Sequence, residues 1–377
     1  MRVPFARPIN MRQFGDPFGG VEDISYSGSY PYSSKAEALM NCFVGGYNLL
    51  TASCTQALEM SLLLHNVNPG DEVIMPSFNF TSAPAVVSSF GATPVFADIK
   101  TEDCNIDPDS ILDVLSEKTK AIIVVNYAGN PCNFEMLKKI ALDNNLALIE
   151  DNAHGLGSKL SGRPLGTFGD VGCHSFHYTK NLHCGEGGAI TLNSPDLIER
   201  AQIVREKGTN RWQFSQGRID KYTWIDKGGS FLLSDFLSRI LCSQLDNFQI
   251  IQENRLGTWN YYHRELFLMA TQAGFICQTV TPDVTPSAHM FYLISRSPER
   301  AQSLLNHLRN CGVEATQHYQ ALHLSPGAKM FASNPRTNLN TAEFVSNGII
   351  RLPLWYGMKE VEKEFVVQHV SSFLSKN

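Results

Sequence analysis

The residues best suited to chemistry lie between positions 150 and 188. An apolar, strand-like run from Leu146 to Ile149 leads into Glu150 and Asp151, and a second short run leads to Lys180 and a glycine-rich stretch. A lysine can form a Schiff base, and a carboxylate can pair with a pyridinium nitrogen that withdraws electrons. Pyridoxal phosphate (PLP) chemistry needs both groups, so this spacing predicts a PLP enzyme.

The elements that would position these residues alternate along the chain. The apolar spacing predicts strands at residues 72–75, 93–96, 121–125 and 147–149, and helices at 57–64, 80–90 and 134–144. Strands separated by helices favour a mostly parallel sheet that is covered on both faces. Ligands of such sheets bind at the carboxyl ends of the strands, and Asp151 falls at one of these ends.

A second unit is expected after residue 245. Residues 235–256 contain no proline or glycine and have helical spacing, which predicts one long helix leading out of the first domain. The remainder alternates strands (290–294 and 349–352) with helices (301–309 and 361–374). We therefore predict an α/β protein with a large PLP-binding domain at residues 1–245 and a small C-terminal domain at residues 246–377.

Composition excludes several classes of protein. The 377 residues carry a formal net charge of -5 without a block of like charges, so no nucleic-acid partner is expected. No apolar run approaches the ~18 residues of a membrane span. The nine cysteines are scattered, which is typical of reduced thiols, and the N-terminus lacks the apolar core of a signal peptide. We expect a soluble, cytoplasmic protein. Histidines and carboxylates do not cluster at ligand spacing, so no metal is expected.

Six segments together resemble the sugar aminotransferases of the DegT/DnrJ/EryC1/StrS family. They are residues 51–58, 75–80, 150–154, 175–181, 185–188 and 205–211, and the likeness covers nearly the whole chain after residue 40. The resemblance implies a PLP-dependent transferase of fold type I. In that fold a large domain surrounds a mostly parallel sheet of the seven-stranded type, and a small α/β domain follows it.

The resemblance also implies roles at the ring of PLP. Lys180 would bind the cofactor and move a proton, Asp151 would keep the pyridine nitrogen protonated, and His154 would contact the phenolic oxygen. Phe80 takes the position at which the family stacks an aromatic ring on the cofactor. An isolated aspartate or histidine at such places would more often be a turn residue or a satisfied core residue.

Other residues are expected at the phosphate. Cys54 and Thr55 open a helix whose backbone N–H groups can hold an anion, and Ser175 would add a hydroxyl. A plain helix cap is the alternative for the first two. Ser230 falls where relatives carry an asparagine that reaches the phosphate of the neighbouring subunit, so the resemblance implies a homodimer with shared active sites.

The family suggests a further set of residues for the substrate. Lys207, Arg211, His318 and Tyr319, together with His323, would line the space over the cofactor. Cationic side chains there could meet the nucleotide diphosphate or the carboxylates of L-glutamate. Solvated surface charge is an equally good interpretation of Lys207.

Residues 207–210, 220–224 and 288–292 carry a narrower likeness, to the branch that serves enterobacterial common antigen synthesis. It implies amination of dTDP-4-dehydro-6-deoxy-D-glucose at C4. Amination at C3 or of another nucleotide ketosugar stays open, as does a non-catalytic PLP-binding sensor. A related dehydratase has histidine in place of the lysine, so Lys180 argues against it. Asn126 replaces a histidine that is usual in relatives, which could alter the sugar pocket.

Overall fold

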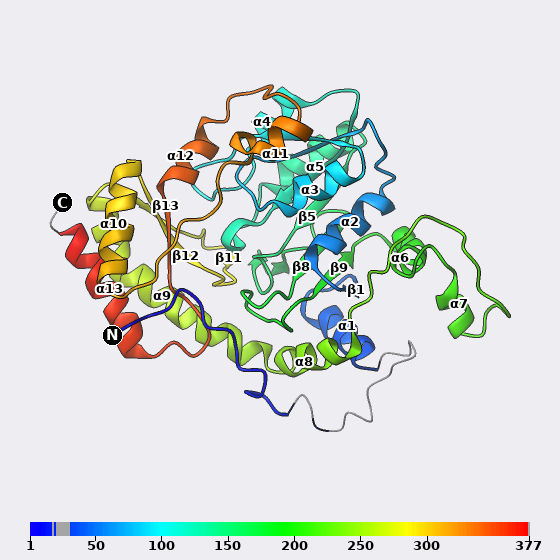
Figure 1. Cartoon of the computed structure of the whole chain (residues 1–377), viewed down its shortest axis with the longest axis horizontal. Coiled ribbons are helices and arrows are strands. Elements are labelled where there is room, and N and C mark those ends of the chain that lie inside the picture. Colours follow the sequence, from blue (N-terminus) through cyan, green and yellow to red (C-terminus); the bar gives the residue numbers. More distant parts are fainter. Residues whose placement is uncertain (17–18, 20–30, 376–377) are drawn as a thin grey trace.

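The computed structural model describes residues 1–16, 19 and 31–375 (Figure 1). Its centre is a seven-stranded sheet in the order β1-β9-β8-β5-β4-β2-β3. The strands are β1 (Tyr47–Thr51), β2 (Glu72–Pro76), β3 (Thr93–Ala97), β4 (Thr119–Val125), β5 (Ala147–Asp151), β8 (Val171–Ser175) and β9 (Gly188–Leu192). Only β9 runs antiparallel to its neighbours among these described strands. The predicted mostly parallel α/β sheet is confirmed.

Helices cover both faces of this sheet because alternate strand residues point in opposite directions. Val73 and Met75 of β2 belong to the core that includes α2, α3 and α6, whereas Ile74 belongs to the core that includes α4 and α5. The helices are α2 (Cys54–Leu64), α3 (Ser82–Ser89), α4 (Pro108–Val114), α5 (Phe134–Asp143) and α6 (Ile198–Arg205). Short 3-10 turns occupy Tyr127–Gly129, Pro195–Leu197 and Leu322–Leu324. Near-continuous apolar strands are what a sheet buried on both faces requires.

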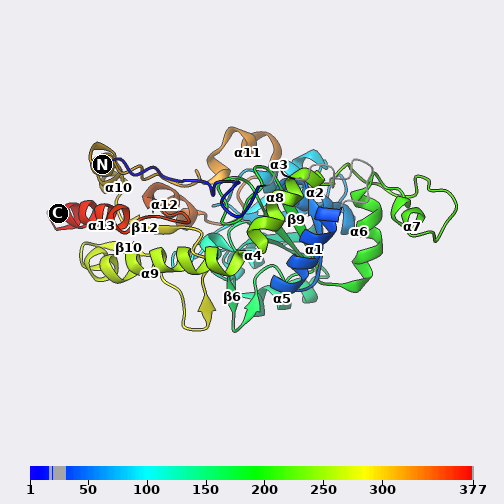
Figure 2. The same cartoon turned by 90° about the horizontal axis from the view of Figure 1, so that it is seen from below.

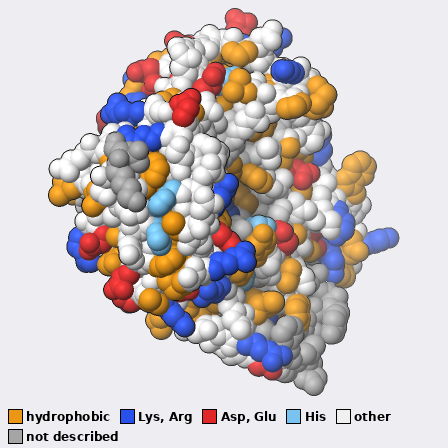
Figure 3. Space-filling view, turned by 60° about the vertical axis from the view of Figure 1, so that its left-hand side comes forward, with side chains coloured by type: hydrophobic (Ala, Val, Ile, Leu, Met, Phe, Trp, Pro, Cys, Tyr) orange, Lys and Arg blue, Asp and Glu red, His pale blue; other side chains and the backbone are white. Residues whose placement is uncertain are grey.

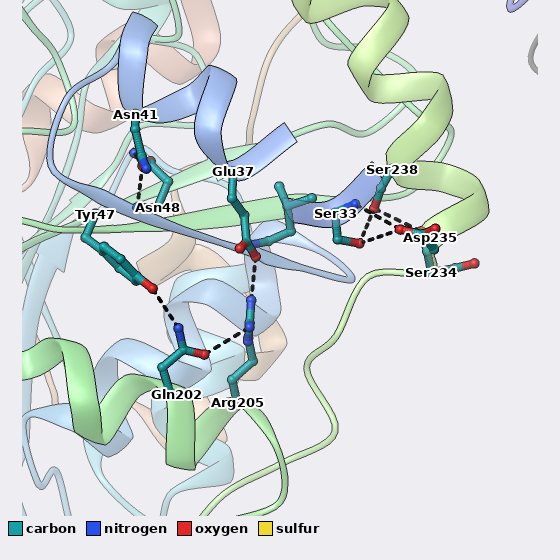
Figure 4. Close-up of polar contacts among 11 residues, drawn as sticks. Ser33, Glu37, Asn41, Tyr47, Asn48, Gln202, Arg205, Ser234, Asp235 and Ser238 are labelled. Carbon is teal, nitrogen blue, oxygen red and sulfur yellow. Dashed lines mark hydrogen bonds and ion pairs between the residues drawn. The ribbon is translucent and has the colours of Figure 1, made fainter. Parts of the chain in front are cut away.

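The edge strand β1 is covered by helix α1 (Pro31–Phe43), whose polar side chains face it (Figure 4). Glu37 Oε1 accepts the N–H of Leu50 at 3.0 Å, and Asn41 Oδ1 accepts that of Asn48 at 3.0 Å. Glu37 also pairs with Arg205 of α6 at 2.5 Å. These contacts satisfy backbone groups that an open edge would expose.

A second core forms around the three-stranded antiparallel sheet β10-β12-β13. Its elements are β10 (Phe275–Cys277), β12 (Phe291–Ser295), β13 (Ile349–Leu352), α9 (Phe248–Gln272), α10 (Pro298–Asn310) and α13 (Glu360–Leu374). Helix α12 (Asn340–Gly348) packs in a separate core with Phe78 and Tyr127. Smaller elements are α7 (Arg211–Ser215), α11 (Pro326–Phe331) and the sheet β11-β6-β7, formed by Val284–Thr285, Lys159–Leu160 and Arg163–Pro164. Figure 2 shows this second unit at one end of an elongated molecule.

The prediction of one continuous helix over residues 235–256 is wrong. The structure has α8 (Asp235–Leu245) and α9 (Phe248–Gln272) instead. The side chain of Asn247 donates to the carbonyl of Ser243 at 2.8 Å, and such local side-chain bonds compete with the helical ladder. The domain boundary predicted after residue 245 falls in this break, and it stays a prediction.

The N-terminal residues connect the two cores. Val3 forms a β-bridge with Val313 and belongs to the second core, while Ile9 belongs to a core shared by α1 and α8. The carbonyl of Ile9 lies 3.2 Å from Nε2 of His183. The polar and aromatic sequence of residues 26–34 favours a packing loop, but residues 31–34 begin helix α1, and residues 26–30 lie outside the described part of the chain.

The surface in Figure 3 intersperses acidic and basic side chains with apolar ones. Within the described part of the chain, no helix combines the length and the apolar character that crossing a membrane requires.

Candidate active site

A cavity of about 440 Å³ opens at the carboxyl ends of β5 and β8. The large-domain residues that line it include the expected set Cys54, Thr55, Phe80, Asp151, His154, Ser175 and Lys180. The side opposite is formed by residues after 288, and Phe5 and Ala6 complete the wall. The carboxyl end of a parallel sheet is where ligands of such folds bind.

Lys180 and Asp151 face one cavity although they come from different strand ends. Asp151 is the last residue of β5 and is 6% exposed. Its Oδ1 accepts the N–H of Ala153 at 3.1 Å, which fixes the carboxylate. Lys180 lies in the connection between β8 and β9, where its N–H donates to the carbonyl of His177 at 2.9 Å. A hairpin and a strand end thus bring an amine and a carboxylate together.

The surroundings of Lys180 favour a neutral amine. Burial lowers the pKa of Lys180 to about 8, and the nearby Asp151 opposes this shift. Burial also raises the pKa of Asp151, while the N–H of Ala153 and the charge of Lys180 lower it. A lysine with a depressed pKa is a nucleophile and base near neutral pH.

His154 is buried and held as one neutral tautomer. The N–H of Ala128 donates to Nδ1 of His154 at 3.4 Å, so the proton of the ring resides on Nε2 and points to the hydroxyl of Tyr319 at 3.3 Å. Burial, followed by the charge of Lys180, places the pKa of His154 well below its usual value. The ring can therefore donate a hydrogen bond without carrying charge.

The start of α2 forms the other end of the cavity. Ser53 caps this helix, and its side chain accepts the N–H of Gln56 at 3.1 Å. The N–H groups of Cys54 and Thr55 are not used by that bond, and Thr55 Oγ1 lies 2.8 Å from Ser82 Oγ. The first N–H groups of a helix attract anions. The expected capping and anion-binding geometries therefore coexist here.

A glycine lets this helix approach the sheet. A Cβ added to Gly188 would lie 2.4 Å from the backbone nitrogen of Cys54. Any other residue at this position of β9 would displace the start of α2.

Phe80 and Phe78, the two candidates for the aromatic ligand contact, differ in exposure and surroundings. Phe80 is 53% exposed and lines the cavity, with its ring centroid 5.8 Å from that of Tyr319. Phe78 is 1% exposed and belongs to a core with Tyr127. Phe80 is thus the residue placed to contact a ligand.

Sequence reasoning missed Arg351, which enters the cavity from β13. Its Nη1 donates to Nε2 of His318 at 2.8 Å, and its guanidinium lies 4.8 Å from the ring centroid of Phe5. Nε of Arg351 is buried and has no hydrogen-bond partner within the described structure. The available signal was a lone arginine within the otherwise apolar strand Ile349–Leu352, where it is half-buried.

His289 was also missed as a site residue. Its ring stacks on that of His154 with centroids 4.6 Å apart, and Nδ1 lies 2.9 Å from the side-chain oxygen of Asn181. Because Asn181 follows Lys180 directly, this contact joins the lysine segment to the second core. The sequence singled out the segment of His289, residues 288–292, only through the narrower likeness and assigned the histidine itself no role.

The predicted residues Lys207, Arg211 and Ser230 are not among the described residues that line the cavity. Arg211 is the first residue of α7, which projects from the body on the extension between α6 and α8 (Figure 1), and Ser230 forms a β-bridge with Glu206 at the end of α6. Arg211 lies 3.6 Å from Glu206 in an ion pair. The roles of these three residues stay predictions.

His323 and Asn126, which were expected near the substrate, have their contacts outside the cavity. His323 binds Ser77 and Glu343, at 2.6 and 3.1 Å, and lies outside the set that lines the cavity within the described chain. Asn126 is fully buried and donates to Glu150 at 3.0 Å. It is not among the described residues that line the cavity, and the expected effect of this replacement on the sugar pocket stays a prediction.

Comparison with known proteins gives one consistent result. Residues 22–371 match the model of the DegT/DnrJ/EryC1/StrS aminotransferase family. An uncharacterized protein of Methanocaldococcus jannaschii, MJ1066, is 31% identical over 354 residues, which are 92% of this chain and 91% of that protein. The aminotransferase TlmJ from Streptoalloteichus hindustanus is similar in structure, with a TM-score of 0.83, 26% identity and coverage of 92% and 91% of the two chains.

The fold is shared more widely. Spr1654 of Streptococcus pneumoniae, a proposed sugar aminotransferase solved in its PLP form, has a TM-score of 0.89 at 23% identity, with coverage of 100% of this chain and 99% of the other.

Proposed function

The chain belongs to the DegT/DnrJ/EryC1/StrS aminotransferase family, and on that premise we propose the reaction that it catalyses. L-Glutamate donates its amino group to the 4-keto carbon of dTDP-4-dehydro-6-deoxy-D-glucose, and dTDP-4-amino-4,6-dideoxy-D-galactose and 2-oxoglutarate are formed. The observation that carries this proposal is the cavity that Lys180 and Asp151 share.

PLP is the cofactor of this family, and the residues present fit it. Lys180 would hold the cofactor covalently, Asp151 would face the ring nitrogen, and the start of α2 with Ser175 would hold the phosphate. The amide Nδ2 of Asn79 lines the cavity and lacks a partner among the described atoms, so a bound group could accept from it. When bound, PLP supplies a carbonyl carbon for the amino group and a ring that withdraws electrons.

The protein's own residues supply the proton transfers. Nζ of Lys180, neutral above its lowered pKa of about 8, would take the proton from the α-carbon of glutamate and pass it to the cofactor, and in the second half of the cycle it would carry a proton from the cofactor to the sugar carbon. Asp151 holds a positive charge on the ring nitrogen, because an anion nearby favours the charged form. His154 donates a hydrogen bond from Nε2 and stays neutral.

Arg351 is proposed to bind a carboxylate of the donor. His318 and Phe5 orient the guanidinium of Arg351. Its Nε is buried and has no hydrogen-bond acceptor within the described structure. A planar guanidinium matches the two oxygens of a carboxylate. His289 and Met290, from a segment of the narrower likeness, also line the cavity and support a sugar-binding role there.

The active form is proposed to be a homodimer with shared sites. The projecting extension exposes four large apolar or aromatic side chains, as expected of a surface that another subunit covers: Phe214, Tyr222, Trp224 and Ile225. From this extension Lys207, Arg211 and Ser230 would reach the partner's cavity. We place the reaction in the cytoplasm, where it would supply a surface polysaccharide.

The test is to incubate the purified protein with glutamate and a panel of dTDP-, UDP- and GDP-linked ketosugars, and to identify the amino sugar by NMR. Reaction with the dTDP-linked 4-ketosugar at C4 is expected. Product only from UDP- or GDP-linked sugars, or at C3, would refute the acceptor but leave the aminotransferase chemistry standing. No conversion of bound PLP by any amino acid would favour the non-catalytic sensor.

A further inference from the structure

Three side chains with metal-binding atoms meet on the second unit, and none of them lines the cavity described above. His307 lies near the end of α10, Cys311 caps that helix, and His369 belongs to α13. Helices α10 and α13 lie side by side in Figures 1 and 2. Residues 307 and 311 are one helical turn apart and therefore share a face.

The geometry of the group is close to that of a coordination site. One ligand atom from each residue lies within 4.8 Å of the other two. Cys311 Sγ is 4.0 Å from Nε2 of His307, and the same nitrogen lies 3.1 Å from the carbonyl of His369 and 3.3 Å from Oγ of Ser372. Phe365 packs edge-on against the ring of His369, with centroids 4.4 Å apart, and limits its rotation.

A ligand set of two imidazoles and one thiol favours a metal ion that binds nitrogen and sulfur. Nitrogen and sulfur ligands suit Zn²⁺, whereas Mg²⁺ and Ca²⁺ require oxygen. Tetrahedral zinc with its usual bond lengths separates ligand atoms by about 3.4 Å. The present ligand-atom separations are at most 4.8 Å, and rotation of the His307 and Cys311 side chains toward His369 would shorten them. All three residues are half-buried, so an ion and a water molecule can enter from solvent.

We propose that His307, Cys311 and His369 form a Zn²⁺ site that joins α10 to α13, with a water molecule as the fourth ligand. Binding releases the thiol proton of Cys311 and shifts the ring proton of His307 from Nε2, which faces the carbonyl of His369, to Nδ1. The sequence alone does not indicate this site, because His369, the third ligand, lies 58 positions after Cys311.

The test is a titration of the reduced holoenzyme with Zn²⁺ in competition with a chromophoric chelator. One zinc per chain is expected to bind to the unmodified protein, and Cys311→Ser and His369→Gln should each weaken this site by about tenfold or more. Cys42→Ser and His263→Gln are matched controls, since Cys42 is exposed on α1 and His263 lies elsewhere on α9.

Two further readouts separate this site from others. Co²⁺ should give the visible bands of a tetrahedral sulfur-ligated ion, and these should vanish in Cys311→Ser alone. Zn²⁺ should raise the Tm of the unmodified protein and of both controls, but not of the two ligand variants. Equal zinc affinity in all proteins, or no binding by the unmodified one, would overturn the proposal.

Discussion

Nη1 of Arg351 donates a 2.8 Å hydrogen bond to Nε2 of His318. An arginine can only donate, so Nε2 accepts and the proton of the imidazole lies on Nδ1, 2.7 Å from the hydroxyl of Tyr127. Burial, then Arg351 and Lys180, keep the pKa of His318 well below its usual value. The neutral ring of His318 thus orients the half-buried cation of Arg351 toward the cavity.

Replacing this cation should weaken donor binding more than cofactor binding. We expect Arg351→Gln to raise the KM for glutamate about 10- to 100-fold, since a hydrogen bond to a charged group contributes about 1.5–3 kcal/mol. Steady-state kinetics and a PLP titration would measure both effects. Arg309→Gln, on the surface of α10, is the control. An unchanged KM with a weaker PLP affinity would contradict the proposed role.

The pKa of Lys180 should set the pH dependence of PLP uptake. Burial disfavours the ammonium form, so the pKa falls to about 8 and the reactive amine dominates above that pH. The uptake rate of the PLP-free protein should therefore rise about tenfold per pH unit below pH 8 and then level off. Absorbance stopped-flow would follow the reaction, with N-α-acetyl-lysine as an unburied reference amine.

Borohydride trapping and peptide mapping would locate the bond formed in that experiment. The label should lie on Lys180, and Lys180→Arg should take up none, because a guanidinium does not deprotonate. Uptake that keeps rising toward pH 10 in the unmodified protein would mean that the amine is not desolvated.

The contact between Glu37 and Arg205 should matter for stability. Their side chains are only 18% and 11% exposed, and Glu37 also accepts the N–H of Leu50. Glu37→Leu leaves a cation largely buried without its partner, so we expect a loss of about 3 kcal/mol in the free energy of unfolding. Urea denaturation would measure it. The double variant Glu37→Leu/Arg205→Met should recover part of this loss, and no recovery would argue against the pair.

A methyl group at Gly188 should disturb the cofactor site. Its carbon would lie 2.4 Å from the backbone nitrogen of Cys54, so the start of α2 must move. We expect Gly188→Ala to lower both the Tm and the affinity for PLP. Gly257→Ala is the matched control, because nothing lies within 4 Å of its added Cβ in α9. That change should stabilise the protein by about 0.5–1 kcal/mol.

Local chemistry explains which parts of the structure could be predicted from the sequence. Asp151 was expected at the end of a buried strand, and Cys54 at the start of a helix, because apolar runs and polar boundaries mark both. Strand β9 was not anticipated, since its first residue, Gly188, was counted as part of a turn. The close approach that requires this glycine exists only in the folded chain.

The remaining misses depend on contacts between distant segments. Arg351 reaches the cavity because β13 pairs with β12, and a strand pattern does not say what lies beyond its end. Lys207 and Arg211 carry charges suited to a substrate, yet the direction of the α7 extension places them away from their own chain's cavity. Charge type alone does not determine such placement.

The passage of residues 3–9 between the two cores has a mechanical consequence. Val3 is fixed at one end and Ile9 at the other, while Phe5 lies against the wall of the cavity. Any hinge opening between the units must stretch or detach this tether. Cleaving the backbone at Ala6 would therefore loosen the relative orientation of the units without removing a single ligand-facing group of the sheet.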